Sequence, residues 1–574
     1  MELTLKHHNN VFFEQYIILY CMYASKTKKF MSVSIKNQPN KQYFYYSNPQ
    51  VVADAIDELI QGVKVFNDNC THSDIHKMVV FINETALPYL PDSDYLEYII
   101  YDDLLPNYSK IIPSYDSSIA RCMLDTVAEQ IEFYVNKIGL SNFPRGEYAT
   151  KSGLARRYLG AVYPDIVNRD LASKVRKRHP KYNIVYNFLR HLKPYGANAI
   201  VSLNSTHEIY KNCLKLDINS SFWVVPMIHN TGSNFTHYQC YNTKIDLDKE
   251  EYIAIIKFTE EGLKKIQKPK GNLPHWLANT FSYNDCFTME TLKDEMTIIR
   301  PTWEDLKFTY GITKKDVQII KRISVTPVPF LDGQRELYRR LHHDKAIAKN
   351  NKDELTTQTI KTTGHCLHGY GNGNWFTEVD GSEWYENLWG YHPKKDPATY
   401  RPFDMILNNY DATIMYEYAR YHILRIIDLF DTVYYYDTDC VVVPDTEENR
   451  EKIKEYNEWI KQLYAQNELN YLDYTHDGHT IGFLELEAKY DAFYYTTGKE
   501  YFYAMNDKLY STTAGYAKNT VAKHIEDDSE LTGLAALEWL VQHPEYETPL
   551  IFLKNGTGIS FTTFKHHKYE KGLY

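Results

Sequence analysis

The chain of 574 residues is long enough to form several domains, each with its own hydrophobic core. Its 43% hydrophobic and 24% charged residues are typical of a globular protein, and its net charge of −10 excludes attraction of nucleic acid by the molecule as a whole. Any polyanion must therefore bind to local basic stretches. The 51 tyrosines fit base stacking and strand formation equally well.

The cysteines and the apolar segments indicate a reduced, cytoplasmic protein. None of the eight cysteines forms a Cys-x-x-Cys pair, which disfavours zinc and redox motifs. The apolar run Phe12–Ala24 contains Glu14 and Gln15, is too short to cross a bilayer, and lacks the features of a signal peptide. We therefore expect a monomer with no membrane partner in the cytoplasm, or in the host cell cytoplasm if the protein is viral.

Residues 1–110 alternate strand and helix signals, which is typical of an α/β or α+β domain. The residue pattern predicts strands at 12–24, 29–35 and 63–67 and a helix at 51–60. A further helix is predicted over residues 117–138, where a serine can cap the amino end and apolar residues recur every four positions.

Residues 145–210 combine Arg and Lys with Tyr, which fits either a solvated helical face or a surface that contacts a phosphate backbone. A short strand is then predicted to end at Asp217, where Asn219 or Ser220 can cap a following helix. A carboxylate at this place can hold a cation near phosphates. Taken alone, Asp217 can equally belong to an ordinary helix start.

The pattern in residues 245–330 predicts mixed strands and loops, and residues 334–367 predict two cation-rich helices that meet near residue 350. On the second helix Lys361, His365 and His368 share one face, and Gly369 can end the helix. The spacing of the two histidines and Cys366 fits no standard zinc site.

An irregular insertion is predicted at residues 371–402, followed by a long helix at 403–430. Residues 434–443 then predict a tight hairpin with Asp437 and Asp439 at its tip. Strands are predicted at 480–487 and 490–495, with a turn before Lys499. Short helices, a strand at 550–553 and a basic tail at 565–571 complete the chain.

The carboxylates of the hairpin indicate a cation. A solvated turn would also carry Asp, but buried carboxylates without partners repel each other, and magnesium is the usual ion for hard oxygen ligands. Asp217 and Asp439 on separate strands suit a two-metal phosphoryl transfer that uses two Mg²⁺ or Mn²⁺ ions. Lys361 on the intervening helix would neutralise a triphosphate, and this order of parts fits a nucleotide polymerase.

At these motifs the chain resembles family B DNA polymerases, and most closely the protein-primed branch of small phages and linear plasmids. The family motif Asp-x-x-Ser-Leu-Tyr-Pro resembles residues 217–223, Asp-Ile-Asn-Ser-Ser-Phe-Trp. The motif Lys-x-x-x-Asn-Ser-x-Tyr-Gly resembles residues 361–369, and Tyr-x-Asp-Thr-Asp-Ser matches residues 435–440 except for Cys440. The Lys-x-Tyr element resembles residues 499–501 and the thumb-entry sequence residues 514–515, so the resemblance covers roughly residues 115–520.

The resemblance implies a role for each matching residue. Asp217 and Asp439 resemble the metal ligands, with the Ile218 carbonyl contributing and Asp437 supporting catalysis. Phe222 takes the place of the tyrosine that excludes a 2′ hydroxyl. The other implied nucleotide contacts are Lys349, Lys361, Ser220, Ser221, His365 and His368, and the implied primer and DNA contacts are Lys499, Tyr501 and Tyr435.

The implied fold is a right-hand polymerase of α/β and α+β domains behind an RNase H-like exonuclease domain. The implied partners are primer-template DNA, dNTPs and a terminal protein primer, with strand displacement. The domains are expected at 1–145 (degenerate exonuclease), 146–264 (basic linker and first part of the palm), 265–332 (first terminal-protein insertion), 333–370 (fingers), 371–402 (second insertion), 403–505 (rest of the palm) and 506–574 (thumb).

Departures from the family concern the nucleotide pocket and the exonuclease. His365, Cys366 and His368 replace an Asn, a Ser and a Tyr, so the chemistry is safer to infer than the nucleotide preference. Of the exonuclease carboxylates only Glu14, Asp74 and Asp125 can be matched, and Phe12 and Arg121 stand where a metal ligand and a tyrosine belong. We therefore expect proofreading to be lost.

Two other classes of function remain open from the sequence. One is a reverse transcriptase or an untemplated nucleotidyl transferase with a palm fold, which Thr438 between the two Asp residues and Lys361 before the hairpin disfavour. The other is a decayed polymerase that only binds nucleic acid or a terminal protein, which the presence of both Asp217 and Asp439 disfavours.

Overall fold

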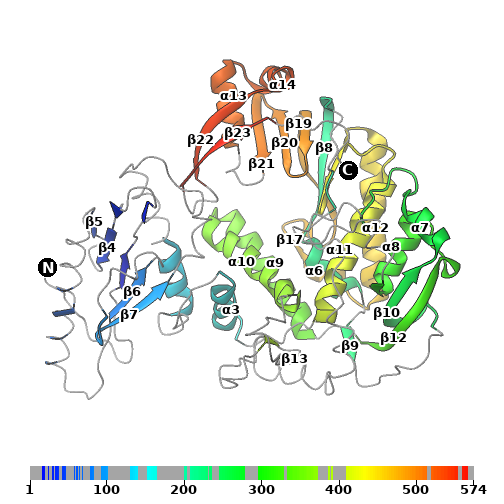
Figure 1. Ribbon diagram of the computed structural model, residues 1–574, viewed down its shortest axis with the longest axis horizontal. Helices are drawn as coiled ribbons and strands as arrows, with labels where there is room; N and C mark the ends of the chain where they lie inside the picture. Colours follow the sequence, from blue (N-terminus) through cyan, green and yellow to red (C-terminus); the bar gives the residue numbers. More distant parts are fainter. Residues whose placement is uncertain are drawn as a thin grey trace. The chain divides into compact units, whose positions relative to one another are not determined.

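The computed structural model divides into two compact units, of which unit 1 comprises residues 1–162, 513–524 and 545–565 and unit 2 the remainder (Figure 1). The structure describes short stretches within residues 16–100, residues 129–139 and 151–164, and then residues 200–202, 207–229, 232–234, 245–277, 295–328, 332–372, 386–387, 390–391, 409–513, 519–553 and 559–566.

Unit 1 has a parallel sheet with the strand order β1-β6-β7, beside which β4 and β5 form an antiparallel hairpin. Mixed α/β structure is therefore present, as the sequence predicted. The bounds are β1 (Tyr16–Leu19), β2 (Tyr23–Ala24), β3 (Lys29–Phe30), β4 (Val33–Asn37), β5 (Gln42–Tyr46), β6 (Met78–Ile82), β7 (Leu96–Ile100), α3 (Lys151–Val162), β22 (Glu547–Leu553) and β23 (Ile559–Lys565).

Some predictions for unit 1 were wrong in detail. Lys64 is helical, which contradicts the strand expected at residues 63–67, the others of which lie outside the described residues; the second parallel strand is β6. The apolar residues Ile56, Ile60 and Val63 follow the helical period, which explains this result. The helix predicted over 117–138 is described from residue 129 and ends at Gly139, whose φ of 79° is left-handed. Its earlier part lies outside the described residues, as do Glu14, Asp74 and Asp125.

Unit 2 is organised around a six-stranded sheet with the order β15-β16-β8-β19-β20-β21. Along β8 the apolar residues Leu214, Leu216 and Ile218 are buried on one face, and Lys215 and Asp217 alternate with them on the other. The bounds are β8 (Tyr210–Ile218), β15 (Tyr435–Asp437), β16 (Cys440–Pro444), β19 (Leu484–Thr497), β20 (Glu500–Met505) and β21 (Lys508–Thr513).

The hairpin prediction at 434–443 is confirmed, whereas the two strands predicted at 480–487 and 490–495 are one strand, β19. A bulge between Leu486 and Ala488 takes up one extra residue, so β19 remains paired with β8 on both sides of it. The lesser elements of this region are β17 (Thr475–His476), β18 (His479–Thr480) and the 3-10 helix η9 (Tyr471–Tyr474).

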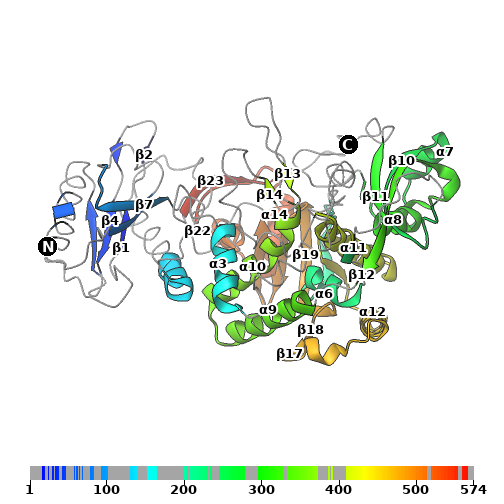
Figure 2. The same cartoon turned by 90° about the horizontal axis from the view of Figure 1, so that it is seen from below.

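Helices α6 (Ser221–Ile228), α11 (Asn409–Leu429) and α12 (Glu447–Gln466) pack with this sheet, and α9 (Asp332–Asn350) and α10 (Glu354–Asn372) lie side by side (Figures 1 and 2). The predicted break near residue 350 is confirmed. The helix end predicted at Gly369 is wrong, because α10 continues through that residue. Most of the insertion predicted at 371–402 lies outside the described residues, apart from β13 (Glu386–Asn387) and β14 (Gly390–Tyr391). Two further helices, α13 (Thr520–Ser529) and α14 (Gly533–Gln542), follow β21.

Residues 232–328 form a second sheet with the order β11-β10-β12-β9, accompanied by α7 and α8 (Figure 2). The prediction of strands and loops therefore missed two helices, although Thr259 caps α7 through a bond from the Gly262 N–H, which is an ordinary helix start. The bounds are β9 (Gly232–Asn234), β10 (Glu251–Phe258), α7 (Glu260–Ile266), β11 (Met296–Ile299), α8 (Arg300–Tyr310), the 3-10 helix η6 (Lys314–Asp316) and β12 (Val317–Val328).

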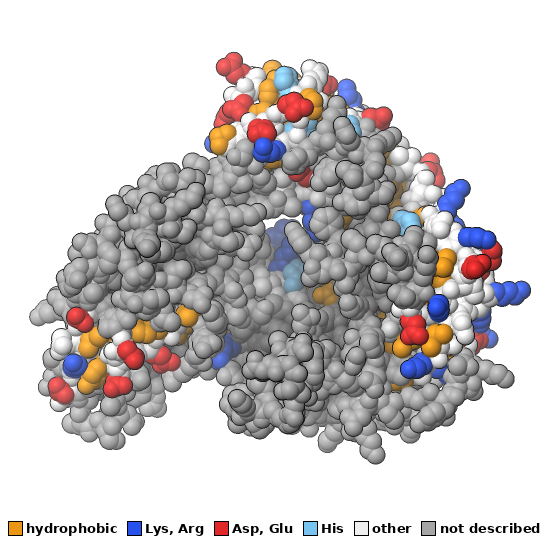
Figure 3. Space-filling model, viewed as in Figure 1, with side chains coloured by type: hydrophobic (Ala, Val, Ile, Leu, Met, Phe, Trp, Pro, Cys, Tyr) orange, Lys and Arg blue, Asp and Glu red, His pale blue; other side chains and the backbone are white. Residues whose placement is uncertain are grey.

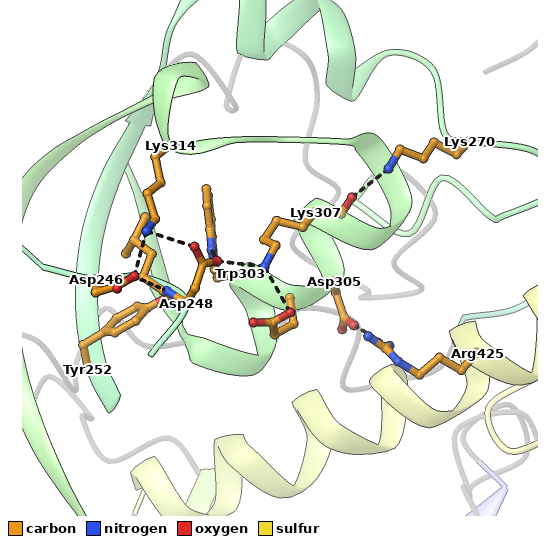
Figure 4. Close-up of polar contacts among 11 residues, drawn as sticks. Asp246, Asp248, Tyr252, Lys270, Trp303, Asp305, Lys307, Lys314 and Arg425 are labelled. Atoms are coloured by element: carbon orange, nitrogen blue, oxygen red, sulfur yellow. Dashed lines mark hydrogen bonds and ion pairs between the residues drawn. The ribbon is translucent and has the colours of Figure 1, made fainter. Parts of the chain in front are cut away.

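A set of charged side chains, which we call the α8–α11 junction, joins α8 to α11; Asp305, Glu417 and Arg420 are buried and Arg425 is half-buried. Arg420 donates to Asp305 at 2.9 Å and also binds Glu417, and its guanidinium lies 3.9 Å from the Trp276 ring centre. Arg425 donates to the other oxygen of Asp305 at 3.3 Å (Figure 4). Each buried carboxylate therefore has a cationic partner.

Lysine and aspartate side chains form ion pairs around the second sheet. Lys314 lies 2.7 Å from Asp246, and Lys307 lies 2.7 Å from Asp248, which also accepts from the Trp303 indole (Figure 4). On the face seen in Figure 3, acidic and basic side chains are interspersed over this region. Among the described residues, none of the helices is both long and apolar enough to span a membrane.

Candidate active site

The carboxylates of the β15–β16 hairpin lie at a tight turn between two paired strands. Asp437 pairs with Cys440 in the antiparallel register, so only Thr438 and Asp439 form the turn. Thr438 adopts a left-handed φ of 61° and its N–H donates to the Ile200 carbonyl at 3.0 Å. The turn is therefore held from outside the hairpin as well as by its own strands.

Asp217 and Asp439 come together because β8 pairs with β16. Cys440 is the direct register partner of Asp217, and the Ile218 N–H donates to the Asp439 carbonyl at 2.8 Å. Burial raises the pKa of both carboxyls above the ordinary value for Asp, and the nearby negative charges of Asp439 at Asp217 and of Asp437 at Asp439 raise them further. Lys361 and Lys215 oppose this effect only in part. The pair is thus a concentration of negative charge that a cation would relieve.

Asp437 faces the turn that carries Lys499. The Tyr435 hydroxyl accepts from the Lys499 N–H at 3.0 Å and donates to Asp437 at 3.4 Å, and the Lys499 ammonium lies 3.7 Å from the same carboxylate. Tyr435 is buried, and its ring centre lies 5.3 Å from that of Tyr501. These four residues link the hairpin to the start of β20.

The turn between β8 and α6 presents backbone and hydroxyl groups beside the carboxylates. Ser220 is the N-cap residue of α6, one of the two positions predicted for the cap, but it has a left-handed φ of 56° and its side chain makes no cap bond. It is held instead by Asn219, whose N–H donates to the Phe483 carbonyl at 2.9 Å and whose carbonyl accepts from Gly482 at 2.7 Å. Ser221 donates its hydroxyl proton to Asp439 at 3.3 Å.

Three lysines of α9 and α10 lie near Asp217 and the Ser220 turn. Two of them, Lys349 and Lys361, had been singled out from the sequence. Both are exposed. The third, Lys345, donates to the Ser220 hydroxyl at 3.3 Å and lies 5.0 Å from the Trp223 ring centre. Burial lowers the pKa of Lys345, the charges of Lys361 and Lys349 lower it further, and Asp217 raises it, which shows that these groups are close. The signal that could have identified Lys345 is its position one helical turn before Lys349.

A fourth cation, also missed from the sequence, lies on β8, the strand that carries Asp217. Lys215 is two residues before Asp217 and therefore on the same face of β8. Its ammonium lies 2.7 Å from Glu487 of β19 and 6.0 Å from the ring centre of Tyr501. Only the strand alternation could have predicted this placement.

Phe222 and Trp223 of α6 reach the helices that carry the lysines. Phe222 is half-buried, and its ring meets that of His365 edge to face at 6.5 Å. A Cβ atom on Gly364 would lie only 2.2 Å from the Trp223 ring, so the indole fits against α10 because residue 364 is glycine. Partial desolvation lowers the pKa of His365, as do Lys361 and Lys345, which favours a neutral imidazole. The side chain of His368 lies outside the described part of α10.

Neither the family models nor the curated proteins include a match to this sequence. Among solved structures, phi29 DNA polymerase in a post-translocation complex with primer-template DNA has a TM-score of 0.54 and 12% identity, with 96% of this chain and 100% of that chain covered. The ternary complex of the same enzyme with primer-template DNA and incoming nucleotide substrates has a TM-score of 0.54 and 13% identity, with 96% of this chain and 99% of that chain covered. The orthorhombic crystal form of phi29 DNA polymerase has a TM-score of 0.54 and 12% identity, with 96% of this chain and 100% of that chain covered.

The chain shares the fold of phi29 DNA polymerase. At this identity the likeness establishes the fold alone. It is a fold of several mixed α/β parts, as the sequence predicted, and the resemblance to family B polymerases is supported at that level.

The residues at this corner fit a divalent cation of the magnesium type. Across the described ranges, no group of three or more His, Cys, Asp or Glu side chains is arranged as a complete metal site. Magnesium, however, is commonly held by one or two carboxylates with substrate phosphates and water, which matches the Asp217–Asp439 pair. The raised pKa of both carboxyls is the structural sign that positive charge is lacking there.

Proposed function

We propose that this protein is a DNA-templated DNA polymerase that adds dNTPs to a 3′ hydroxyl. The observation that carries the proposal is the half-buried Asp217–Asp439 pair, which faces three lysines of α9 and α10 in a chain with the phi29 DNA polymerase fold. Negative charge that would hold cations thus lies opposite positive charge that would hold a triphosphate.

In this proposal Asp217 and Asp439 hold two Mg²⁺ or Mn²⁺ ions, with the Ile218 carbonyl as a further ligand and Asp437 in support. When bound, the ions lower the pKa of the 3′ hydroxyl and neutralise the triphosphate. The protein orients the carboxylates through the β8–β16 pairing and the Ser221 hydroxyl, so that both point to one place before the substrate arrives.

The remaining residues bind the substrates. Lys361, Lys349 and Lys345 neutralise the phosphates that the cations leave uncompensated, and the Ser220 turn offers backbone groups to the same phosphates. Lys499 and Tyr501 contact the primer end, and the Tyr435 hydroxyl keeps them in register with Asp437. Phe222 lies where the sugar of the nucleotide would be, with His365 beside it.

In domain terms, the six-stranded sheet apart from β21 would belong to the palm, α9 and α10 would be the fingers, and residues 506–574, which include β21, would be the thumb. Residues 265–332 and residues 371–402 would be the insertions that bind a terminal protein and support strand displacement. Protein priming and the loss of proofreading by residues 1–145 rest on the motifs alone, and each has a direct assay: nucleotide–protein adduct formation and degradation of single-stranded DNA.

Primer extension with Mg²⁺ on DNA and RNA templates tests the proposal. We expect synthesis on DNA, and a fall of at least about 100- to 1000-fold in Asp439→Asn, because a charge that acts in the transition state is lost. Full activity of Asp439→Asn would contradict the assignment. Preference for an RNA template, or extension without a template, would indicate one of the alternative transferases.

A further inference from the structure

The aromatic ring at the proposed sugar site is held from a helix that carries none of the motifs. Phe222 of α6 meets Tyr416 of α11 edge to face, with ring centres 5.3 Å apart and an interplanar angle of 71°. This contact is closer than the one between Phe222 and His365 at 6.5 Å. Edge-to-face pairs of this kind restrict the rotation of both rings.

Tyr416 stands on a rigid part of the structure. It lies between Met415 and Glu417, both fully buried, and Glu417 belongs to the α8–α11 junction, where it binds Arg420 and accepts from Thr302 at 2.6 Å. Met415 also packs on α9, because its sulfur lies 3.9 Å from the Tyr338 hydroxyl. The backbone that bears Tyr416 is therefore fixed on both of its sides.

His365 offers a different kind of contact. It lies on α10, the same helix as Lys361, and is exposed. A residue beside a phosphate-binding lysine has to accommodate each incoming nucleotide, whereas Tyr416 approaches Phe222 from the buried helix α11. These two contacts of Phe222 therefore come from different surroundings, one from a mostly buried helix and one from an exposed side chain.

A ring excludes a 2′ hydroxyl by its bulk only while it cannot turn away from the sugar. We propose that Tyr416 is the positioning residue that holds Phe222 in its discriminating orientation, and that it thereby sets the preference for deoxynucleotides over ribonucleotides. This inference rests on the proposed polymerase function. Tyr416 acts through Phe222 and touches neither the reacting atoms nor the triphosphate.

The test compares kcat/KM for a dNTP and for the matching rNTP in single-nucleotide extension. In Tyr416→Leu we expect the dNTP-to-rNTP ratio to fall about two- to tenfold, which corresponds to the loss of one edge-to-face aromatic contact. The change should lie mainly in the rNTP kinetics. Tyr416→Phe keeps the ring and should keep the ratio, and Tyr416→Met takes the place of the leucine variant if that variant does not fold.

A second pair of variants separates positioning from general damage. In a Phe222→Val background the ring to be positioned is absent, so adding Tyr416→Leu should leave the ratio unchanged. An unchanged dNTP-to-rNTP ratio in folded Tyr416→Leu, or an equal loss of kcat/KM with both nucleotides, would overturn this inference. Neither result would contradict the proposed polymerase function. Absence of any incorporation by the wild-type protein would instead overturn the proposed function, and this inference with it.

Discussion

At the α8–α11 junction each buried carboxylate faces an arginine, whereas at the end of β8 the two enclosed carboxylates face each other. Asp305 and Glu417 both contact Arg420, and all three side chains are almost completely inaccessible to solvent. The charges of Lys215 and Lys361 compensate those of Asp217 and Asp439 in part. The same helix–sheet framework thus contains one balanced set of buried charges and one unbalanced set.

The difference teaches which buried charges belong to the architecture. Arg420 binds both carboxylates of the junction and thereby holds α8 against α11, and Thr302 donates to Glu417 as well. Like charges held close together lower the free energy of unfolding. Proteins retain such destabilising pairs where the charges take part in chemistry. Burial raises the pKa of Asp305 and Glu417 as well, and Arg420 opposes that rise at both carboxyls, as Arg425 also does at Asp305.

Breaking the balanced set should produce the largest loss of stability. Arg420→Met leaves Asp305 and Glu417 buried without their main partner, so we expect the free energy of unfolding to fall by about 3–5 kcal/mol, measured by urea denaturation. Arg450→Met, which breaks a half-exposed pair with Asp445, is the control and should cost less than about 1 kcal/mol. An equal loss of unfolding free energy in the two variants would mean that the charges of the junction do not stabilise one another.

The unbalanced set can be probed from its positive side. Lys361→Ala should raise the KM for dNTPs about 10- to 100-fold in steady-state primer extension, because a charge-assisted contact to phosphate is lost, and should leave the Kd for primer-template DNA unchanged. Lys454→Ala removes a fully exposed lysine of α12 and serves as the control. Loss of DNA affinity with an unchanged KM would place Lys361 on the path of the duplex instead.

A neutral buried pair between these two extremes predicts a dependence on pH. The Nε2 atoms of His229 and His422 lie 3.0 Å apart, and Nδ1 of His422 lies 3.0 Å from the Tyr456 hydroxyl. Burial, aided by the Arg425 charge, lowers the pKa of His422 to about 3. Below about pH 6.5 the unfolded chain binds a proton at His422, whereas the folded chain binds it only near pH 3. The folded state therefore loses stability as the pH falls between these two values.

Urea denaturation at several pH values between 7 and 5 measures this effect. For His422 alone the loss should approach about 1.4 kcal/mol per pH unit below pH 6.5. His422→Gln keeps polar atoms at the site but cannot titrate, so its stability should vary less with pH over the same range. The same slope in both proteins would show that His422 takes up its proton freely in the folded state.

The sequence predicted the elements that bear the site because their signals are local. The hairpin at 434–443 and the two helices that meet near residue 350 follow from strand-forming residues, turn residues and helical periodicity within short windows. The motifs also indicated that Asp217 and Asp439 lie close together, and the β8–β16 register pairs the strands that carry them. Their roles in catalysis remain predictions.

What the sequence could not supply depends on contacts between distant segments. Lys345 gained its place from the fit of α9 against the Ser220 turn, and Lys215 from the face of β8 on which it lies. The strand predicted at 63–67 is contradicted at Lys64, because the apolar residues of this short run also follow the helical period. The contact between Tyr416 and Phe222 joins residues 194 positions apart, 416 minus 222, with no motif around the first of them.

Thermal unfolding of the DNA-free protein at increasing Mg²⁺ concentration tests the central claim that Asp217 and Asp439 form an unbalanced pair that binds a cation. The wild-type Tm should rise with Mg²⁺, because a ligand that binds only the folded state stabilises it. Asp217→Asn should start from a higher Tm without metal, since the repulsion is removed, and should rise little when Mg²⁺ is added. An equal rise with Mg²⁺ in both proteins would contradict the account, because it would place the ion away from this pair of carboxylates.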